Sequence, residues 1–210
     1  LDGNGHAQVF RRTNLERVAT VRNPENWINA AAFLDEDHLI VGAYDGHLLL
    51  WNIPKAAASG FVPGEYDSSR RKPAPAEALV RDLNEYARGG QQSISAVQVR
   101  DGKIYFGCAD KALHQRSIDG KKLLSLTGHT SAVSCFDFLD EHHVVTGSYD
   151  KTVRIFDLRT KKCLTVVEGH THTIWDVVAL GPTSFATASD DNQIRQYHID
   201  WELEAKNRAQ

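Results

Sequence analysis

One module of about 40 residues recurs along this chain, and this repeat constrains the fold more than any other feature. The pair Gly128-His129 occurs again as Gly169-His170, 41 residues later. The further positions that coincide at this offset without a gap are Thr146 with Thr187, Asp150 with Asp191, Phe156 with Tyr197, and Val133 with Ile174. A fixed period of this length indicates a repeat architecture, in which each module buries its apolar face against a neighbour.

Two further copies precede this pair. A good copy lies 105 residues before the Gly128 copy, and its matching positions are Ile28, Phe33, Gly42, Tyr44, Asp45 and Trp51. A degenerate copy lies between them, with Gly107 and Asp110 standing 40 residues before their counterparts. Its first strand, 94–99, aligns only with a gap of one residue. The chain therefore contains two strong copies, one good copy and one degenerate copy.

Each copy is typical of four short strands separated by turns. In the Gly128 copy, the segments rich in β-branched and aromatic residues are 132–138, 142–148 and 153–158, and a fourth strand follows at 161–167. The tight turn SYDKT separates the second strand from the third. Four short strands in each repeat predict one blade of a β-propeller. The expected fold class is therefore all-β, with about four blades present.

The segment VVTGSYDKTVRIFDL, 144–158, resembles a WD repeat of the β-transducin type. The resemblance covers about residues 6–200, which is nearly the whole chain. It implies a WD-repeat β-propeller, and rings of this family usually have about seven blades. We therefore expect the missing remainder of the propeller to come from residues beyond those printed or from a partner chain that completes it.

The expected domain organisation is a propeller segment at 1–200 and a C-terminal tail at 201–210. The segment comprises a partial blade at 4–22 and blades at about 23–83, 90–127, 128–168 and 169–200. A loop insertion occupies 55–90, and its first half, rich in Gly, Ser, Ala and Pro, is typical of a flexible surface loop. Its second half leaves two alternatives open, because 76–89 fits either a helix or the fourth strand of the blade.

The resemblance also implies a hydrogen-bonded chain inside each blade, made by a histidine, a hydroxyl, a turn aspartate and an aromatic residue. The implied residues are His129, Thr146 and Asp150 beside Phe156, then His170, Thr187, Asp191 and Tyr197, and finally Asp45 and Trp51 in the first full blade. A buried polar network with all partners present makes a blade rigid. Phe156 cannot donate a hydrogen bond, so we expect that network to end at Thr146.

The same residue types make up a hydrolase triad, which raises a catalytic alternative. A catalytic triad occurs once and needs an oxyanion hole, whereas this set recurs with the repeat. We therefore expect no catalytic residues, and we predict that the protein is not an enzyme. His170 and His172 lack the third and fourth ligands of a zinc site, so we also expect no metal and no cofactor.

Charge and cysteine content restrict the partners and the compartment. The formal net charge of −3 gives no reason to expect nucleic acid or an anionic membrane as the main partner. The cysteines, at positions 108, 135 and 163, have no C-x-x-C spacing. Buried reduced thiols fit them best, and these favour a cytoplasmic or nuclear location.

We expect a non-enzymatic scaffold for protein–protein interaction within a multi-subunit assembly, as the resemblance implies. Loops on one rim of a propeller are free to vary, and aromatic and charged residues are common in binding hot spots. The candidate partner-binding rim consists of Trp27, Tyr44, Tyr149, Lys151, Lys111, His172, Asp190 and Asn192. Trp27 would be the strongest anchor if it is exposed.

Two alternative functions stay open. The segment VVTGSYDKTVRIFDLR also resembles the WD-x-R box of substrate receptors for cullin-type ubiquitin ligases, in which Asp157 and Arg159 would contact the ligase adaptor. The other alternative is an RNA-associated assembly factor in ribosome biogenesis or splicing. RNA is then a possible partner, although the net charge favours protein contacts.

Overall fold

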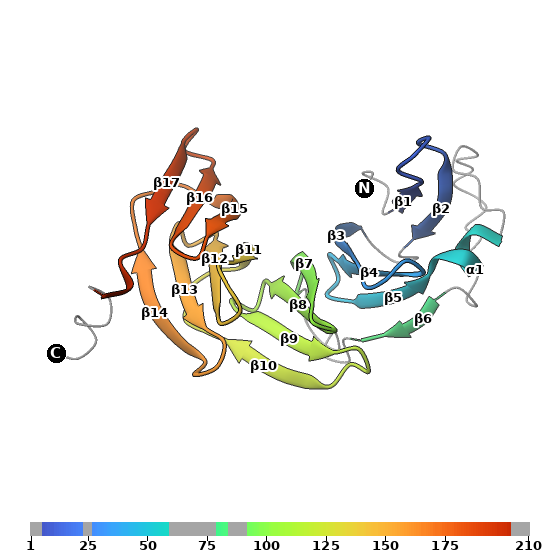
Figure 1. Cartoon of the computed structure of the whole chain (residues 1–210), viewed down its shortest axis with the longest axis horizontal. Coiled ribbons are helices and arrows are strands. Elements are labelled where there is room, and N and C mark those ends of the chain that lie inside the picture. The colour runs from blue at the N-terminus through green and yellow to red at the C-terminus, as the bar shows by residue number, and fades with distance from the viewer. Residues whose placement is uncertain (1–5, 23–26, 59–78, 84–91, 203–210) are drawn as a thin grey trace. The chain divides into compact units, whose positions relative to one another are not determined.

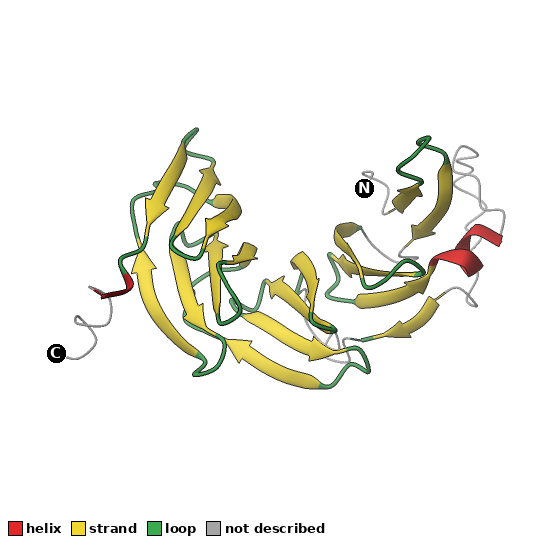
Figure 2. Ribbon diagram, in the orientation of Figure 1, coloured by secondary structure: helices red, strands yellow, loops and turns green. Residues whose placement is uncertain are grey.

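The computed structural model describes residues 6–22, 27–58, 79–83 and 92–202. Within these ranges the chain forms 17 strands and one short helix, α1. Figure 2 shows strands throughout the described chain. The strands build five antiparallel sheets, and in the sheets of three or four strands the order follows the chain, as expected for propeller blades. The all-β fold class predicted from the repeat is confirmed. No helix in these ranges is long and apolar enough to cross a membrane.

The chain divides into two compact units. The first contains residues 1–106 and 116–122, and the second contains 107–115 and 123–210. In the first unit, a two-stranded sheet is formed by β1 (His6–Phe10) and β2 (Arg17–Arg22). A four-stranded sheet is formed by β3 (Ile28–Phe33), β4 (His38–Ala43), β5 (Leu48–Asn52) and β6 (Leu79–Asp82).

The boundary between the units passes through the next sheet. Its strands are β7 (Ile94–Arg100), β8 (Lys103–Cys108), β9 (Leu113–Ser117) and β10 (Lys122–Leu126). The remaining two sheets lie in the second unit. One consists of β11 (Val133–Phe138), β12 (His143–Ser148), β13 (Val153–Asp157) and β14 (Lys162–Val167). The other consists of β15 (Ile174–Gly181), β16 (Ser184–Ser189) and β17 (Ile194–His198).

The core of the second unit lies between the sheets β11–β14 and β15–β17, which are neighbours in Figure 1. Val145 and Val153 of β12 and β13 pack in one apolar cluster with Val177 and Phe185 of the following sheet. Gly147 lies where the two sheets approach closely: a Cβ atom there would lie 2.6 Å from Sγ of Cys135 in its own sheet and 2.7 Å from Cγ2 of Ile174 in the next. This glycine of the repeat is therefore required by packing between the sheets.

Helix α1 (Ile53–Ala58) corrects part of the predicted insertion loop. The side-chain oxygen of Asn52 accepts a hydrogen bond from the amide of Lys55 at 2.9 Å, which caps the helix. Pro54 falls in the first turn, where its missing N–H costs nothing. Ile53 and Ala56 are buried in the cluster that contains Trp51. The loop prediction was wrong for 55–58. It relied on the Gly and Pro content of the insertion, whereas an N-cap at Asn52 followed by alanines favours a short helix.

The alternatives left open for 76–89 are resolved where the structure describes the chain. Residues 79–82 form β6, the fourth strand of its sheet, which pairs antiparallel with β5. The amide of Leu83 continues this pairing by donating to the carbonyl of Leu48 at 2.7 Å. The rest of the insertion, 59–78 and 84–91, lies outside the described residues.

The chain after β17 packs against the preceding sheet for a short distance. Trp201 stacks on His143, with ring centroids 4.5 Å apart. Its indole N–H donates to the carbonyl of Pro182 at 3.2 Å. The predicted tail therefore begins with an anchored tryptophan, while 203–210 lies outside the described residues.

Candidate functional site

The His129 set lies together inside the sheet β11–β14. Nδ1 of His129 is 2.8 Å from Oδ2 of Asp150, and Nε2 is 2.8 Å from Oγ1 of Thr146. Burial lowers the pKa of His129, against the opposing charge and hydrogen bond of Asp150. The neutral imidazole therefore donates from Nδ1 to the carboxylate and accepts at Nε2 from the threonine hydroxyl.

The His170 set repeats this geometry in the last sheet. Nδ1 of His170 is 2.7 Å from Oδ2 of Asp191, and Nε2 is 2.7 Å from Oγ1 of Thr187. The same carboxylate oxygen of Asp191 accepts the amide of Thr171 at 3.1 Å. The structure thus brings the members of each set together, the His129 set in the sheet β11–β14 and the His170 set in the sheet β15–β17.

The two turn aspartates are held in their ionised form. Burial acts to raise the pKa of Asp150, but hydrogen bonds from the Thr152 hydroxyl and from the amides of Thr130 and Thr152 outweigh it and lower the pKa to about 2. Burial likewise acts to raise the pKa of Asp191, and the hydrogen bonds of His170 and nearby amides lower it to about 2. Each carboxylate therefore joins a turn to the loop that carries the histidine.

This geometry suits an internal frame, because the imidazoles are almost fully buried. The side chains of His129 and His170 are each 1% exposed. Phe156 is buried, with its ring centroid 6.4 Å from that of His129. Tyr197 stacks on Phe185 at 5.0 Å. Phe156 therefore packs beside its set, while the ring of Tyr197 packs on Phe185.

The corresponding set of the first unit is incomplete in the described residues. Asp45 accepts the amide of His47 at 3.2 Å, as a turn aspartate does. Trp51 is buried, and its indole Nε1 finds no hydrogen-bond partner there. Val41 stands at the position of the threonine hydroxyl, because it matches Thr146 at the 105-residue offset. The set of this sheet therefore lacks its hydroxyl, and the indole N–H is left without a partner among the described residues.

The predicted rim residues are all exposed, and the aromatic ones pair. Trp27 is 59% exposed, and its ring centroid lies 6.1 Å from that of Tyr44 in the first unit. In the second unit, the centroid of Tyr149 lies 5.2 Å from that of Trp175. The charged and polar rim residues are also exposed, namely Lys111, Lys151, His172, Asp190 and Asn192.

Sequence reasoning missed Trp175, which is 51% exposed at the start of β15. Its counterpart in the preceding copy is Ser134, a buried residue that donates to the carbonyl of Ile174. A tryptophan at the position of a small buried residue was the signal that could have identified it. Trp175 sits at an irregularity in the pairing of β15 with β16, between Ile174 and Asp176.

The last sheet exposes large apolar side chains that no described residue covers. Ile194 is 82% exposed and Leu180 is 53% exposed. Their counterparts one repeat earlier, Val153 and Leu139, are 1% and 5% exposed because the sheet β15–β17 packs on them. This set of side chains therefore has the composition of a surface that packs against another sheet.

The residues of the ligase-type box adopt an ordinary turn. Oδ1 of Asp157 accepts the amides of Arg159 at 2.7 Å and Thr160 at 3.0 Å. The Arg159 guanidinium lies 3.9 Å from the same carboxylate, and its side chain is 75% exposed. An adaptor contact through Asp157 and Arg159 stays a prediction.

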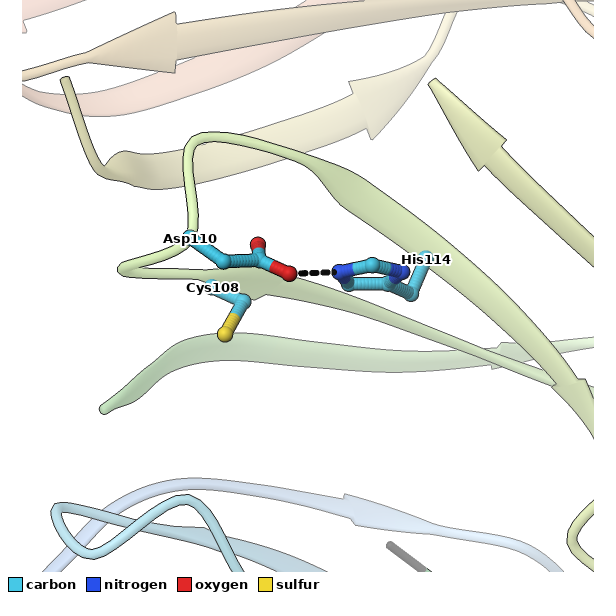
Figure 3. Close-up of side chains that lie close together, drawn as sticks. All are labelled: Cys108, Asp110 and His114. Carbon is cyan, nitrogen blue, oxygen red and sulfur yellow. Dashed lines mark hydrogen bonds and ion pairs between the residues drawn. The ribbon is translucent and has the colours of Figure 1, made fainter. Parts of the chain in front are cut away.

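A separate cluster of ligand-type side chains lies at the turn between β8 and β9, and Figure 3 shows it. Cys108, Asp110 and His114 each offer a donor atom, and these atoms lie within 4.8 Å of one another. Nε2 of His114 is 2.7 Å from Oδ2 of Asp110, and Nδ1 is 2.8 Å from Oγ of Ser125. Sequence reasoning missed the cluster, although its signal is the spacing C-x-D-x3-H.

A family model described as "WD domain, G-beta repeat" matches residues 15–52, 120–157 and 161–198, more than half of the chain. The chain is similar to the ribosome biogenesis protein WDR12 homolog of Drosophila persimilis, with 26% identity over 231 residues that cover 96% of this chain and 53% of that protein. It is also similar to the ribosome biogenesis protein YTM1 of Vanderwaltozyma polyspora, with 26% identity over 144 residues that cover 69% of this chain and 30% of that protein.

Among solved structures, the computationally designed Ika4 protein is similar to this chain. The TM-score is 0.65 at 23% sequence identity, and the match covers 87% of this chain and 98% of that one. At this identity the likeness concerns the fold alone. The chain spans about half the length of the WDR12 homologs that it matches.

Proposed function

The chain belongs to the WD40 repeat family, and we propose on this basis that it acts as a non-enzymatic scaffold that binds other proteins within a multi-subunit assembly. The two histidine sets support this proposal, because they hold turns and loops in fixed positions and keep both imidazoles almost fully buried. The rims of the blades then carry the variable side chains that contact partners.

The observation that carries the proposal is the exposed aromatic pair Tyr149 and Trp175. Tyr149 is fixed by its position beside the Asp150 turn, and its amide donates to the carbonyl of Ala132 at 3.0 Å. Large aromatic side chains on a rigid backbone lose little conformational entropy on binding, and Trp and Tyr are enriched in binding hot spots. We assign this pair as the anchor for a protein partner.

Affinity purification with quantitative mass spectrometry tests this assignment. Trp175→Ala should reduce recovery of specific partner proteins at least about tenfold, the loss expected of a hot-spot residue worth more than 1.4 kcal/mol. Val166→Ser is the matched control, because Val166 is also exposed in the second unit but lies on β14, away from the aromatic pair. Equal recovery with both variants would refute the assignment.

Within this class, we propose an assembly that serves ribosome biogenesis, and with it a nuclear location. This proposal is supported by the two relatives, which are both described as ribosome biogenesis proteins. The alignment with the WDR12 homolog covers 96% of this chain. The net charge of −3 favours contact with the protein components of such an assembly over direct contact with RNA.

Sedimentation of cell extracts tests the ribosome proposal. The protein should co-sediment with precursor ribosomal particles, and this association should persist at a salt concentration that removes proteins held by phosphate contacts, since such contacts weaken steeply with salt. Recovery only in light fractions, with the partners of the first experiment still bound, would exclude ribosome biogenesis and leave the scaffold function intact.

The exposed apolar side chains of the last sheet support the proposal that a further blade packs there. Its exposed residues, Leu180 and Ile194, match positions that a sheet covers one repeat earlier. The contact one repeat earlier includes a polar bond, in which Oδ2 of Asp137 accepts the amide of Ala179 at 2.8 Å. We propose that this blade comes from the same polypeptide or from a partner chain.

A further inference from the structure

We propose that Cys108, Asp110 and His114 form a binding site for a zinc ion, with the three side chains supplying one thiolate, one carboxylate oxygen and one imidazole nitrogen. All three come from one turn and the strand ends beside it, so the site is local to the second unit. This role is separate from partner binding at the rim, because it uses none of the aromatic rim residues.

The donor set matches the preference of zinc. Zn²⁺ is bound by sulfur, imidazole nitrogen and carboxylate oxygen in tetrahedral sites, and three protein ligands leave a fourth position for water. The three donor atoms already lie within 4.8 Å of one another, and Nε2 of His114 faces Oδ2 of Asp110 at 2.7 Å (Figure 3). A metal ion that enters between them replaces this hydrogen bond with two coordinate bonds.

Ser125 supplies the outer contact that a ligating histidine needs. Its Oγ lies 2.8 Å from Nδ1 of His114, the nitrogen that faces away from Asp110. Metal-bound histidines nearly always donate their other ring N–H to such a partner, which fixes the tautomer. With zinc bound, Nδ1–H donates to Ser125 and Nε2 presents its lone pair to the metal. Ser125 is therefore a positioning residue.

The other repeats show that the blade frame does not require these residues. At the positions of Cys108 and His114, the copy with the His129 set has Ser148 and Arg154, and the last copy has Ser189 and Arg195. In those copies the turn aspartate pairs with a histidine from the preceding loop. Only the β7–β10 sheet, among those described, places a sulfur and an imidazole around its turn aspartate.

Access and proton balance are compatible with binding. Cys108 is buried, while the side chains of Asp110 and His114 are 26% and 13% exposed, so the ion enters from the carboxylate side. In the metal-free protein the thiol is protonated, since burial raises the pKa of Cys108 to about 12. Binding transfers that proton to solvent, and the thiolate, the carboxylate and a neutral imidazole then carry a net charge that balances Zn²⁺.

Titration of the full chain with Co²⁺, a spectroscopic substitute for Zn²⁺, tests the site. We expect one equivalent to bind and to give a sulfur-to-cobalt charge-transfer absorption in the near ultraviolet. Cys108→Ser should abolish that absorption with the fold retained, since serine occupies the equivalent position in two other sheets. Cys163→Ser, which replaces the half-buried cysteine of β14, should leave the absorption unchanged.

Zinc affinity of two further variants completes the test. Ser125→Ala should weaken zinc binding by roughly 10–100-fold, the usual effect of removing an outer-shell partner, with the cobalt absorption shifted but present. Asp110→Asn keeps the side-chain volume and should weaken binding further. No sulfur-to-cobalt absorption in the wild-type chain, or an absorption that survives Cys108→Ser, would show that the cluster is a hydrogen-bond network only.

Discussion

At the scale of single residues, the threonine hydroxyl of each polar set is the hydrogen-bond partner of Nε2 of the buried histidine. We expect Thr146→Val to lower the free energy of unfolding by about 1–3 kcal/mol, because valine keeps the shape but leaves Nε2 of His129 unsatisfied in the core. Urea denaturation measures the change. Thr130→Val is the control, because Thr130 is exposed and contacts Asp150 through its amide. Equal effects of both substitutions would contradict a buried role for the hydroxyl.

The same set predicts how stability depends on pH. Burial lowers the pKa of His129 below its ordinary value of 6.5, so the folded protein binds this proton less readily than the unfolded chain. Its contribution to stability is present above pH 6.5 and is lost as the pH falls below it. The pKa of Asp150 is lowered to about 2, so its contribution is lost only between pH 3.8 and about 2.

We therefore expect wild-type stability to decline first as the pH falls below 6.5, and the decline to be shallower in His129→Gln. Unfolding free energies measured by urea titration at several pH values give both slopes. A variant with the full wild-type slope below pH 6.5 would show that His129 does not contribute to the decline.

The sequence predicted the residues of both polar sets because they recur at a fixed offset. It could not predict Trp175 or His114 in the same way, since neither residue repeats. The functional side chains of a repeat protein are the ones that differ between copies. Periodicity therefore identifies the residues that hold each blade together, but it does not identify binding sites. At both places the signal was a departure from the repeat. Trp175 stands where the preceding copy has Ser134, and His114 stands where the following copy has Arg154.

At the scale of elements, equivalent strand positions have different surroundings in successive sheets. Val153 of β13 is buried against the following sheet, whereas its counterpart Ile194 of β17 is 82% exposed. We expect Val153→Ala to lower the unfolding free energy by roughly 2 kcal/mol, from lost burial and the cavity left behind. Ile194→Ala should change it by less than about 0.5 kcal/mol in the isolated chain. Similar losses in both would mean that Ile194 is already covered.

Strand boundaries were predictable where alternation and turn residues agree, as in 142–148 for β12. The insertion was harder, because α1 depends on a single cap at Asn52 and on burial of Ile53 against residues distant in sequence. The ambiguity at 76–89 had a similar origin. A pattern such as ALVRDL satisfies a short helix or a strand, and the available edge of β5 decides in favour of β6.

At the scale of the whole molecule, the WD40 repeats supply rigid blades whose edges and faces are the functional surfaces. The polar sets lie inside the sheets β11–β14 and β15–β17. In our proposal, the aromatic pair binds a partner at a rim, and the exposed apolar side chains of the last sheet pack against a further blade. The proposed scaffold function therefore assigns different residues to two roles, those that hold a blade together and those that would contact partners.

The most direct test of this account is a side-by-side comparison of His129→Gln and Trp175→Ala, in which thermal stability and partner recovery are both measured. We predict that His129→Gln lowers the unfolding temperature and retains its partners below it. Trp175→Ala should retain stability within about 1 kcal/mol and lose the partners. Partner recovery that depends on His129 in a folded variant, with Trp175 dispensable, would contradict the account.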